Sequence, residues 1–124
     1  MTVYLDNAST TGRPSYSQTN DTTEQTVFTS TKTVPRMIQV YLDVTTLTQN
    51  STVRLYVRTD GTNYISCDTN DGRLPYAFTV ASDADNITIG PYVVGDAFRV
   101  TIQAGALEGA ARAIPYHVIE HLLS

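Results

Sequence analysis

The sequence predicts an all-β fold: a single antiparallel β-sandwich, Ig-like or jelly-roll-like, of about 7–9 strands with an extended N-terminal arm. The main observation is the alternation of apolar and polar residues, which dominates from about residue 36 onward. A second is the spacing of Gly, Pro, Asn and Asp, which separate strand-like segments at intervals of about 8–12 residues. No amphipathic helix competes, because Gly105 and Gly109 interrupt the alanine-rich segment 104–113, which is expected to be a turn.

The first two well-patterned strands are residues 37–44 and 53–58. The residues expected to face the core in these strands are Ile38, Val40, Leu42, Val44, Val53, Leu55 and Val57. Polar residues alternate with them, which is typical of strands with one buried and one solvated face. Asp60 and Gly61 predict a tight turn into residues 64–67, so the second strand and this segment are expected to form a hairpin.

Further strands follow in the second half of the chain. Residues 76–80 and 86–90 are rich in β-branched and aromatic residues, and the latter strand is expected to stop at Gly90 and Pro91. Residues 98–104 alternate again, with Phe98, Val100, Ile102 and Ala104 on the inner face. A terminal strand is expected to end the domain.

Residues 1–24 are predicted to form the arm, and residues 25–124 the sandwich. The segment 6–24 shows no periodicity and has few apolar residues. An ordered arm of this kind needs a surface to lie on, so it packs either on its own domain or on a neighbouring subunit. For the second case the candidate interaction residues are Val3, Tyr4, Leu5 and Tyr16.

The composition excludes several classes of protein. Its 8 Lys and Arg stand against 12 Asp and Glu, and this net charge of −4 argues against nucleic-acid binding through phosphate neutralisation. The chain begins without the basic and apolar segments of a secretory signal, and no apolar run approaches the roughly 18 residues of a membrane span. The single cysteine, Cys67, fits a reducing cytosol and is expected to be a small buried hydrophobe.

Neutral polar residues take the place of charges in this chain. Only 16% of the residues are charged, whereas 20 are Thr, 8 are Ser and 6 are Asn. Burying a hydrogen-bonded hydroxyl costs far less free energy than burying a charge. The composition therefore favours a surface that another protein covers.

The strongest catalytic motif is the segment from His117 to His121, HVIEH, which has the H-x-x-E-H order of inverted zinc peptidases. That site needs both histidines on one face of a helix and a third ligand farther along the chain. Only three residues follow His121, and the surrounding alternation indicates a strand, in which the two histidines are about 13 Å apart. We expect both histidines to lie on the surface or at a subunit interface.

Residues 68–72, with Asp83 and Asp85 close in sequence, resemble part of an EF-hand calcium loop. The glycine comes one position early, and Thr79 stands where a bidentate glutamate is required. Two interpretations stay open: ordinary turns rich in Asn and Asp, or a loosely built calcium site that joins two loops. No nucleophile motif or phosphate loop is present, so the sequence predicts neither an enzyme nor a cofactor.

Eight tyrosines are spread over the predicted strands and turns. Outward tyrosines beside Thr and Asn form either a sugar- or protein-binding face, or ordinary cross-strand pairs. Tyr41 and Tyr56 are expected to form such a pair if their strands are neighbours.

Residues 47–64 (LTQNSTVRLYVRTDGTNY) and 108–116 (EGAARAIPY) resemble small virion-associated proteins of tailed phages. The resemblance extends over roughly the last 90 residues and includes no diagnostic motif, so no functional residue is carried over. It implies a compact β-sandwich without enzymatic activity, made in the host cytoplasm and assembled in many copies in the virion.

These observations together predict a virion structural protein of the capsid decoration or cement type. Its expected partners are other copies of itself and a major capsid or tail protein, with no nucleic acid, membrane or cofactor. The alternative is a carbohydrate- or receptor-binding sandwich module of a tail fibre, which would use exposed Tyr, Asn and Asp side chains.

Overall fold

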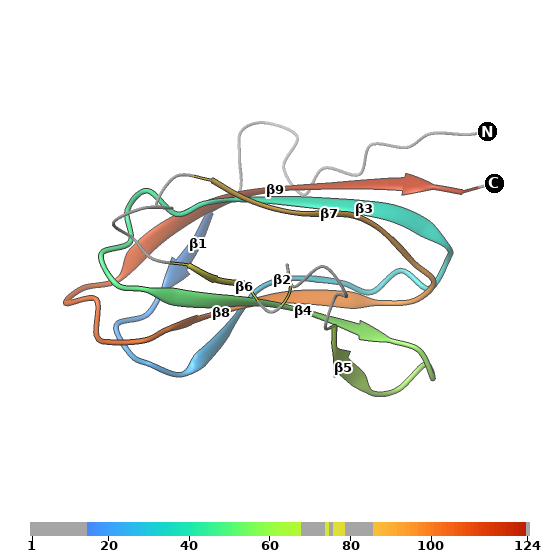
Figure 1. Cartoon of the computed structure of the whole chain (residues 1–124). Helices are drawn as coiled ribbons and strands as arrows, with labels where there is room; N and C mark the ends of the chain where they lie inside the picture. Colours follow the sequence, from blue (N-terminus) through green and yellow to red (C-terminus); the bar gives the residue numbers. More distant parts are fainter. Residues whose placement is uncertain (1–14, 68–73, 75, 79–85, 124) are drawn as a thin grey trace.

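The structure, a computed structural model, describes residues 15–67, 74, 76–78 and 86–123 (Figure 1). These residues form strands and no helix. The strands are β1 (Ser15–Gln18), β2 (Glu24–Ser30), β3 (Arg36–Asp43), β4 (Ser51–Arg58), β5 (Tyr64–Ser66), β6 (Tyr76–Phe78), β7 (Asn86–Val94), β8 (Phe98–Ala104) and β9 (Arg112–Leu122). Two antiparallel sheets, β1-β9-β3-β7 and β2-β8-β4-β5, form two layers, and β6 also pairs with β4. The predicted all-β antiparallel sandwich is confirmed.

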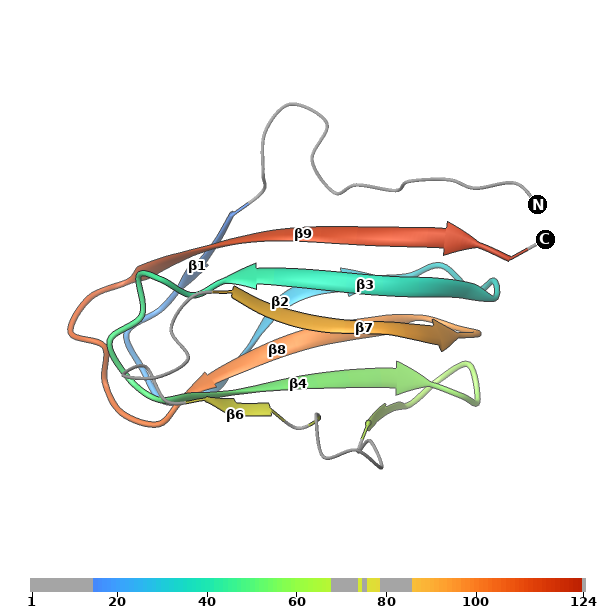
Figure 2. The same ribbon diagram turned by 45° about the horizontal axis from the view of Figure 1, so that its top comes forward.

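The strand pairs are nested along the chain. β1 pairs with β9, β2 with β8, β3 with β7, and β4 with both β5 and β6. The chain thus forms one long antiparallel hairpin, and folding that hairpin over brings β9 beside β3 and β8 beside β4. Figure 2 shows β9, β3 and β7 side by side in one layer. Of the two topologies that the sequence leaves open, this strand order is that of a jelly roll.

The core lies between the two sheets. The side chains that the alternation places inside on β3, β4 and β8 are buried, apart from Val57, which is half-buried at the end of β4. Residues from β2, β7 and β9 complete the cluster, including Val27, Ile89, Ile114 and Val118. Each fully buried aliphatic side chain contributes about 1.5–3 kcal/mol to folding, so this layer of side chains supplies the main driving force.

The described end of the predicted arm is part of the sandwich. β1 lies within the predicted arm and pairs with residues 112–115 of β9. β2 begins at Glu24, the last residue of the predicted arm. Only Tyr16 and Gln18 of β1 face inward, and four residues are too few for alternation to be visible in the sequence. In β2 the register shifts between Thr26 and Phe28, and such a bulge interrupts the alternation.

β7 continues through the position where the sequence predicts its end, so that prediction was wrong. The Gly90–Pro91 peptide bond is cis, Gly90 has a φ of 99°, and the β3–β7 register shifts opposite this point. A Cβ atom on residue 90 would lie 2.6 Å from the backbone oxygen of Ile38, so only glycine fits there. Proline is tolerated because β7 is an edge strand, where a ladder N–H is not needed on the outer side.

A buried ion pair closes one end of the sandwich. Arg36 is fully buried at the start of β3, and its Nε donates a hydrogen bond to Glu120 of β9. Its remaining nitrogens donate to Ser30 Oγ at 3.0 Å and to the backbone oxygens of Val34 and Asp96 at 2.8 and 3.0 Å. The pair therefore joins β3 and β9 to the end of β2 and to the turn before β8.

Glu108 fixes the loops at the other end. Its carboxylate accepts hydrogen bonds from Thr48 N at 2.8 Å, Thr48 Oγ1 at 2.7 Å and Gln49 N at 3.0 Å, and Arg112 Nε lies 3.4 Å away. Burial acts to raise the pKa of Glu108, but these hydrogen bonds and the arginine outweigh it, so the pKa lies below its usual value. The β8–β9 loop is thereby held against the β3–β4 loop.

Candidate interaction site

The outer surface of the β1-β9-β3-β7 sheet, which we call the uncharged face, carries almost no formal charge. Its outward side chains are Ser15, Ser17, Met37, Gln39, Tyr41, Asn86, Thr88, Pro91, Val93, Ala113, Pro115, His117, Ile119 and His121. Asp43, at the end of β3, is the acidic residue at its border and accepts hydrogen bonds from Thr45. A surface of this composition can be covered without burying an ion.

The registers of β3 place these side chains in rows across three strands. Tyr41 lies between Thr88 of β7 and His117 of β9, and its ring centroid is 6.3 Å from that of His117. Tyr41, His117, Thr88, Asn86 and Ile119 line a shallow hollow of about 360 Å³.

A second row crosses the other end of the uncharged face. Met37 lies between Val93 of β7 and His121 of β9. Val93 is 69% exposed, although it is a large apolar residue within a strand. The face therefore combines exposed apolar side chains with neutral hydrogen-bonding groups.

The outer surface of the other sheet, which we call the arginine face, has the opposite chemistry. Its outward side chains include Glu24, Thr26, Thr29, Thr52, Arg54, Tyr56, Arg58, Tyr64, Arg99, Thr101 and Gln103. The guanidinium of Arg99 lies 5.3 Å from the ring centroid of Tyr56 and 4.3 Å from that of Tyr64, within the range of cation–π attraction. Arg58 lies 5.5 Å from the same Tyr64 ring and donates to Asp96 at 3.0 Å.

Glu24 organises the rest of the arginine face. It accepts hydrogen bonds from Thr101 Oγ1 at 2.5 Å and Tyr56 Oη at 2.7 Å, and Arg54 lies 3.9 Å away. Burial acts to raise the pKa of Glu24, but these hydrogen bonds and the nearby arginines lower it overall. The hydrogen bond to Glu24, with burial, raises the pKa of Tyr56. The charges of this face are thus largely neutralised within the chain.

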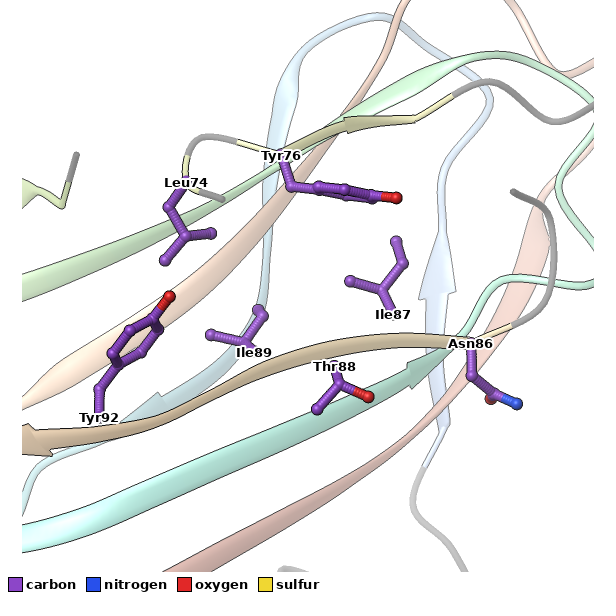
Figure 3. A pocket seen from close by; sticks show the side chains of 7 residues that line it. All are labelled: Leu74, Tyr76, Asn86, Ile87, Thr88, Ile89 and Tyr92. Carbon is purple, nitrogen blue, oxygen red and sulfur yellow. The ribbon is translucent and has the colours of Figure 1, made fainter. Parts of the chain in front are cut away.

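A third feature is a small hollow of about 190 Å³ between β6 and β7, at the edge where the two sheets separate (Figure 3). Tyr76 and Tyr92 stand on opposite sides of it, and Ile87 and Ile89 point into the space between them. Thr88, on the same strand, points away. The hollow offers apolar walls and two phenol groups, a combination that suits a small ligand with an apolar side.

The predicted interaction residues fall into two groups. Val3, Tyr4 and Leu5 lie outside the described residues. Tyr16 is half-buried in β1 and donates a hydrogen bond from its hydroxyl to Gln25 Oε1 at 2.7 Å. Burial, with the charge of Asp21, raises the pKa of Tyr16. Tyr16 thus connects β1 to β2 of its own chain.

The structure places the two histidines on a strand, as the alternation predicts. His117 and His121 both lie on the outer side of β9. In the described part of the chain, no cluster of three or more His, Cys, Asp or Glu residues could hold a metal ion. The candidate calcium loop at 68–72, together with Asp83 and Asp85, lies outside the described residues.

The other sequence predictions have mixed outcomes. The hairpin after β4 is confirmed, and Asp60 caps its turn with hydrogen bonds from Thr62 N and Asn63 N, each 2.8 Å, which lower the pKa of Asp60 to about 2. Cys67 follows β5 and is only partly buried against the core. The condition for pairing Tyr41 with Tyr56, that their strands are neighbours, is not met, because β3 and β4 belong to different sheets.

Comparison with known proteins identified no relative of this chain. No known protein family, no curated protein and no solved structure matches the chain. Within the described residues there is no helix of the length and apolarity needed to cross a membrane.

Sequence reasoning missed the contrast between the two faces. Alternation does predict that Arg54, Tyr56 and Arg99 point outward, as they do. It does not predict which strands are neighbours, so the contact of Arg99 with two tyrosine rings was not predicted. Val93 was missed for another reason, because the predicted strand ended before it.

Proposed function

We propose that this chain is a non-enzymatic virion structural protein of the capsid decoration type, which acts by protein–protein contacts through its uncharged face. The observation that carries the proposal is that face itself: a broad sheet surface with the exposed Val93, the half-buried Met37 and Ile119, and almost no formal charge. Desolvating it strands no ion, so contact with a capsid or tail protein gains apolar burial without an electrostatic penalty.

The jelly-roll topology is compatible with this proposal, because viral capsid domains commonly use it. The same topology occurs in lectin domains, so the fold does not select between the two functions that the sequence predicts. The resemblance to small phage virion proteins supports the virion assignment and assembly in the host cytoplasm.

The second candidate function is carbohydrate or receptor binding within a tail fibre. The hollow between Tyr76 and Tyr92 favours it, because aromatic rings beside hydroxyl groups suit the mixed apolar and polar surface of a sugar. A glycan array tests this candidate: specific binding that is lost in Tyr92→Ala supports it, and the absence of binding rejects it.

The test of the main proposal is co-sedimentation of the purified protein with empty capsids, and separately with tails, of the phage that encodes it. Thr88→Glu places a charge on the uncharged face, at an exposed position of the edge strand β7. Thr26→Glu is the matched control, because Thr26 is an exposed outward threonine on the edge strand β2 of the arginine face.

We expect the wild-type protein and Thr26→Glu to sediment with capsids, and Thr88→Glu to bind at least about tenfold more weakly, since a buried unpaired charge costs more than about 1.4 kcal/mol. Binding that is equally weakened by both substitutions, or binding to neither particle, contradicts the proposal.

A further inference from the structure

Part of one edge of β9, along residues 116–122, has no pairing partner among the described residues. β9 is 11 residues long, and on one side residues 116–122 pair with β3. On the other side β1 pairs only with residues 112–115 (Figure 2). Alternate N–H and C=O groups of residues 116–122 therefore point outward from the sheet, as in any strand at an edge.

This open edge lacks the features that normally prevent strand-to-strand association. Natural edge strands carry outward charges, prolines or bulges. The outward side chains of the open segment are His117, Ile119 and His121. Its carboxylate, Glu120, faces inward, where Arg36 and Ser30 bind it. The partly exposed ammonium group of Lys32 lies 3.6 Å from this carboxylate. The register between residues 116–122 and β3 is continuous, with no bulge.

We propose that two copies of this chain associate through this edge, with their β9 strands antiparallel across a two-fold axis at Ile119. Ile119 then faces Ile119 of the second copy, and His117 of each copy faces His121 of the other. The two β1-β9-β3-β7 sheets join into one continuous sheet, and the uncharged faces of both copies lie on the same side of it.

A second copy is the occupant that the chemistry favours. The pairing is self-complementary, as a two-fold contact requires, and it brings no like formal charges together on the outer side. A contact between two arginine faces would instead bring both copies of Arg54, Arg58 and Arg99, which are all cationic, into one interface.

This inference deepens the proposed function, which rests on contacts with copies and with a virion protein. The inference and the proposed function are tested by different experiments: dimerisation is measured on the isolated protein, and capsid binding is measured with capsids. A dimer without capsid binding upholds only the inference, and capsid binding by a monomer upholds only the proposed function.

The first test compares Ile119→Lys with Val93→Lys by sedimentation equilibrium over a dilution series. Both residues are apolar, outward and on the uncharged face, but Val93 lies on β7, at the opposite edge of the same sheet. We expect the wild-type chain and Val93→Lys to dimerise. Ile119→Lys places two ammonium groups face to face and should raise the dissociation constant by about tenfold or more. Circular dichroism verifies that both variants fold.

The second test locates the axis with a disulfide. Directly opposite residues in an antiparallel pair have Cβ atoms about 4.5–5.5 Å apart, within reach of a bridge after small adjustment. On mild oxidation, Ile119→Cys should form an interchain disulfide between the introduced thiols of the two copies, identified by mass spectrometry. Val93→Cys and the wild-type chain, with Cys67 alone, are the controls and should not form interchain links at the same rate.

Three results overturn the inference. The first is a wild-type chain that stays monomeric throughout the dilution series. The second is an equal loss of dimer in Ile119→Lys and Val93→Lys. The third is a dimer that survives Ile119→Lys but is lost when residues 1–14 are deleted, which would make the N-terminal segment the occupant.

Discussion

The two outer faces of this sandwich are built by the same alternation of side chains, yet they use charge in opposite ways. On the arginine face, Arg54, Arg58 and Arg99 are engaged with Gln103, Asp96 and two tyrosine rings of their own chain. On the uncharged face, exposed side chains such as Val93 and Thr88 point to solvent.

The difference indicates a division of roles between the two faces. Exposed ion pairs and cation–π contacts contribute modestly to stability and leave a hydrated surface. A neutral surface with exposed apolar groups contributes little to the stability of the isolated chain. A partner can cover it, however, at a low free-energy cost of desolvation. Substitution of buried charged residues should therefore change the stability of the fold. Introducing a charge on the uncharged face should instead weaken association.

The largest expected effect is on the buried ion pair. Arg36→Met should lower the free energy of unfolding by about 3–5 kcal/mol, because Glu120 loses its buried cation and keeps only Ser30 and the partly exposed Lys32, which lies 3.6 Å away. Urea denaturation measures this loss. The double variant Arg36→Met/Glu120→Leu should recover most of it, and a single variant with the wild-type midpoint contradicts this role of buried charge.

The next effect is the pH dependence contributed by Glu108. Because its pKa is lowered in the folded state, its stabilisation is complete above the unfolded pKa of about 4.3 and is lost as pH falls through the folded value. Glu108→Gln should lower stability at pH 7 by about 1–3 kcal/mol. It should also reduce the fall in the free energy of unfolding that the wild type shows between about pH 5 and pH 3. Thermal unfolding across this range measures both effects, and parallel pH profiles for variant and wild type argue against them.

A smaller effect is expected on the arginine face. Arg99→Gln removes two cation–π contacts, each worth about 0.5–1 kcal/mol at an exposed site. The free energy of unfolding should fall by about 1–2 kcal/mol in total, while the dimer dissociation constant stays unchanged. A large change in association would mean that the arginine face, too, takes part in contacts between copies.

The smallest effect on stability is expected on the uncharged face. Thr88→Glu should change the unfolding free energy of the isolated chain by no more than about 0.5 kcal/mol, as is usual for exposed positions. Chemical denaturation measures this value. A marked loss of stability would show that Thr88 supports the fold and would remove it as a probe of association.

Much of the fold follows from local patterning. The alternation in residues 37–44, 53–58 and 98–104 predicted β3, β4 and β8 and their inner faces, because each inward residue is apolar. β1 and β2 escaped prediction because β1 has four residues and β2 contains a bulge near Val27. Neither offers enough uninterrupted alternation to be recognised.

The arrangement of the strands is a different matter. Pairing depends on contacts between residues far apart in sequence, such as Arg36 with Glu120, and no short-range pattern encodes them. The same limit explains why the sequence left open whether Tyr41 and Tyr56 are neighbours, and why it did not predict the actual neighbours of Tyr41, which are Thr88 and His117. The low charge of the sequence predicted a surface to be covered, but only the strand order shows that the neutral residues share one face.

Hydrogen–deuterium exchange of the protein, free and bound to empty capsids, tests most directly whether association uses the uncharged side of the sandwich. The account predicts slower exchange on binding in β7, with β2 and β5 of the opposite sheet unchanged. Protection confined to β2, β4, β5 and β8 would contradict it.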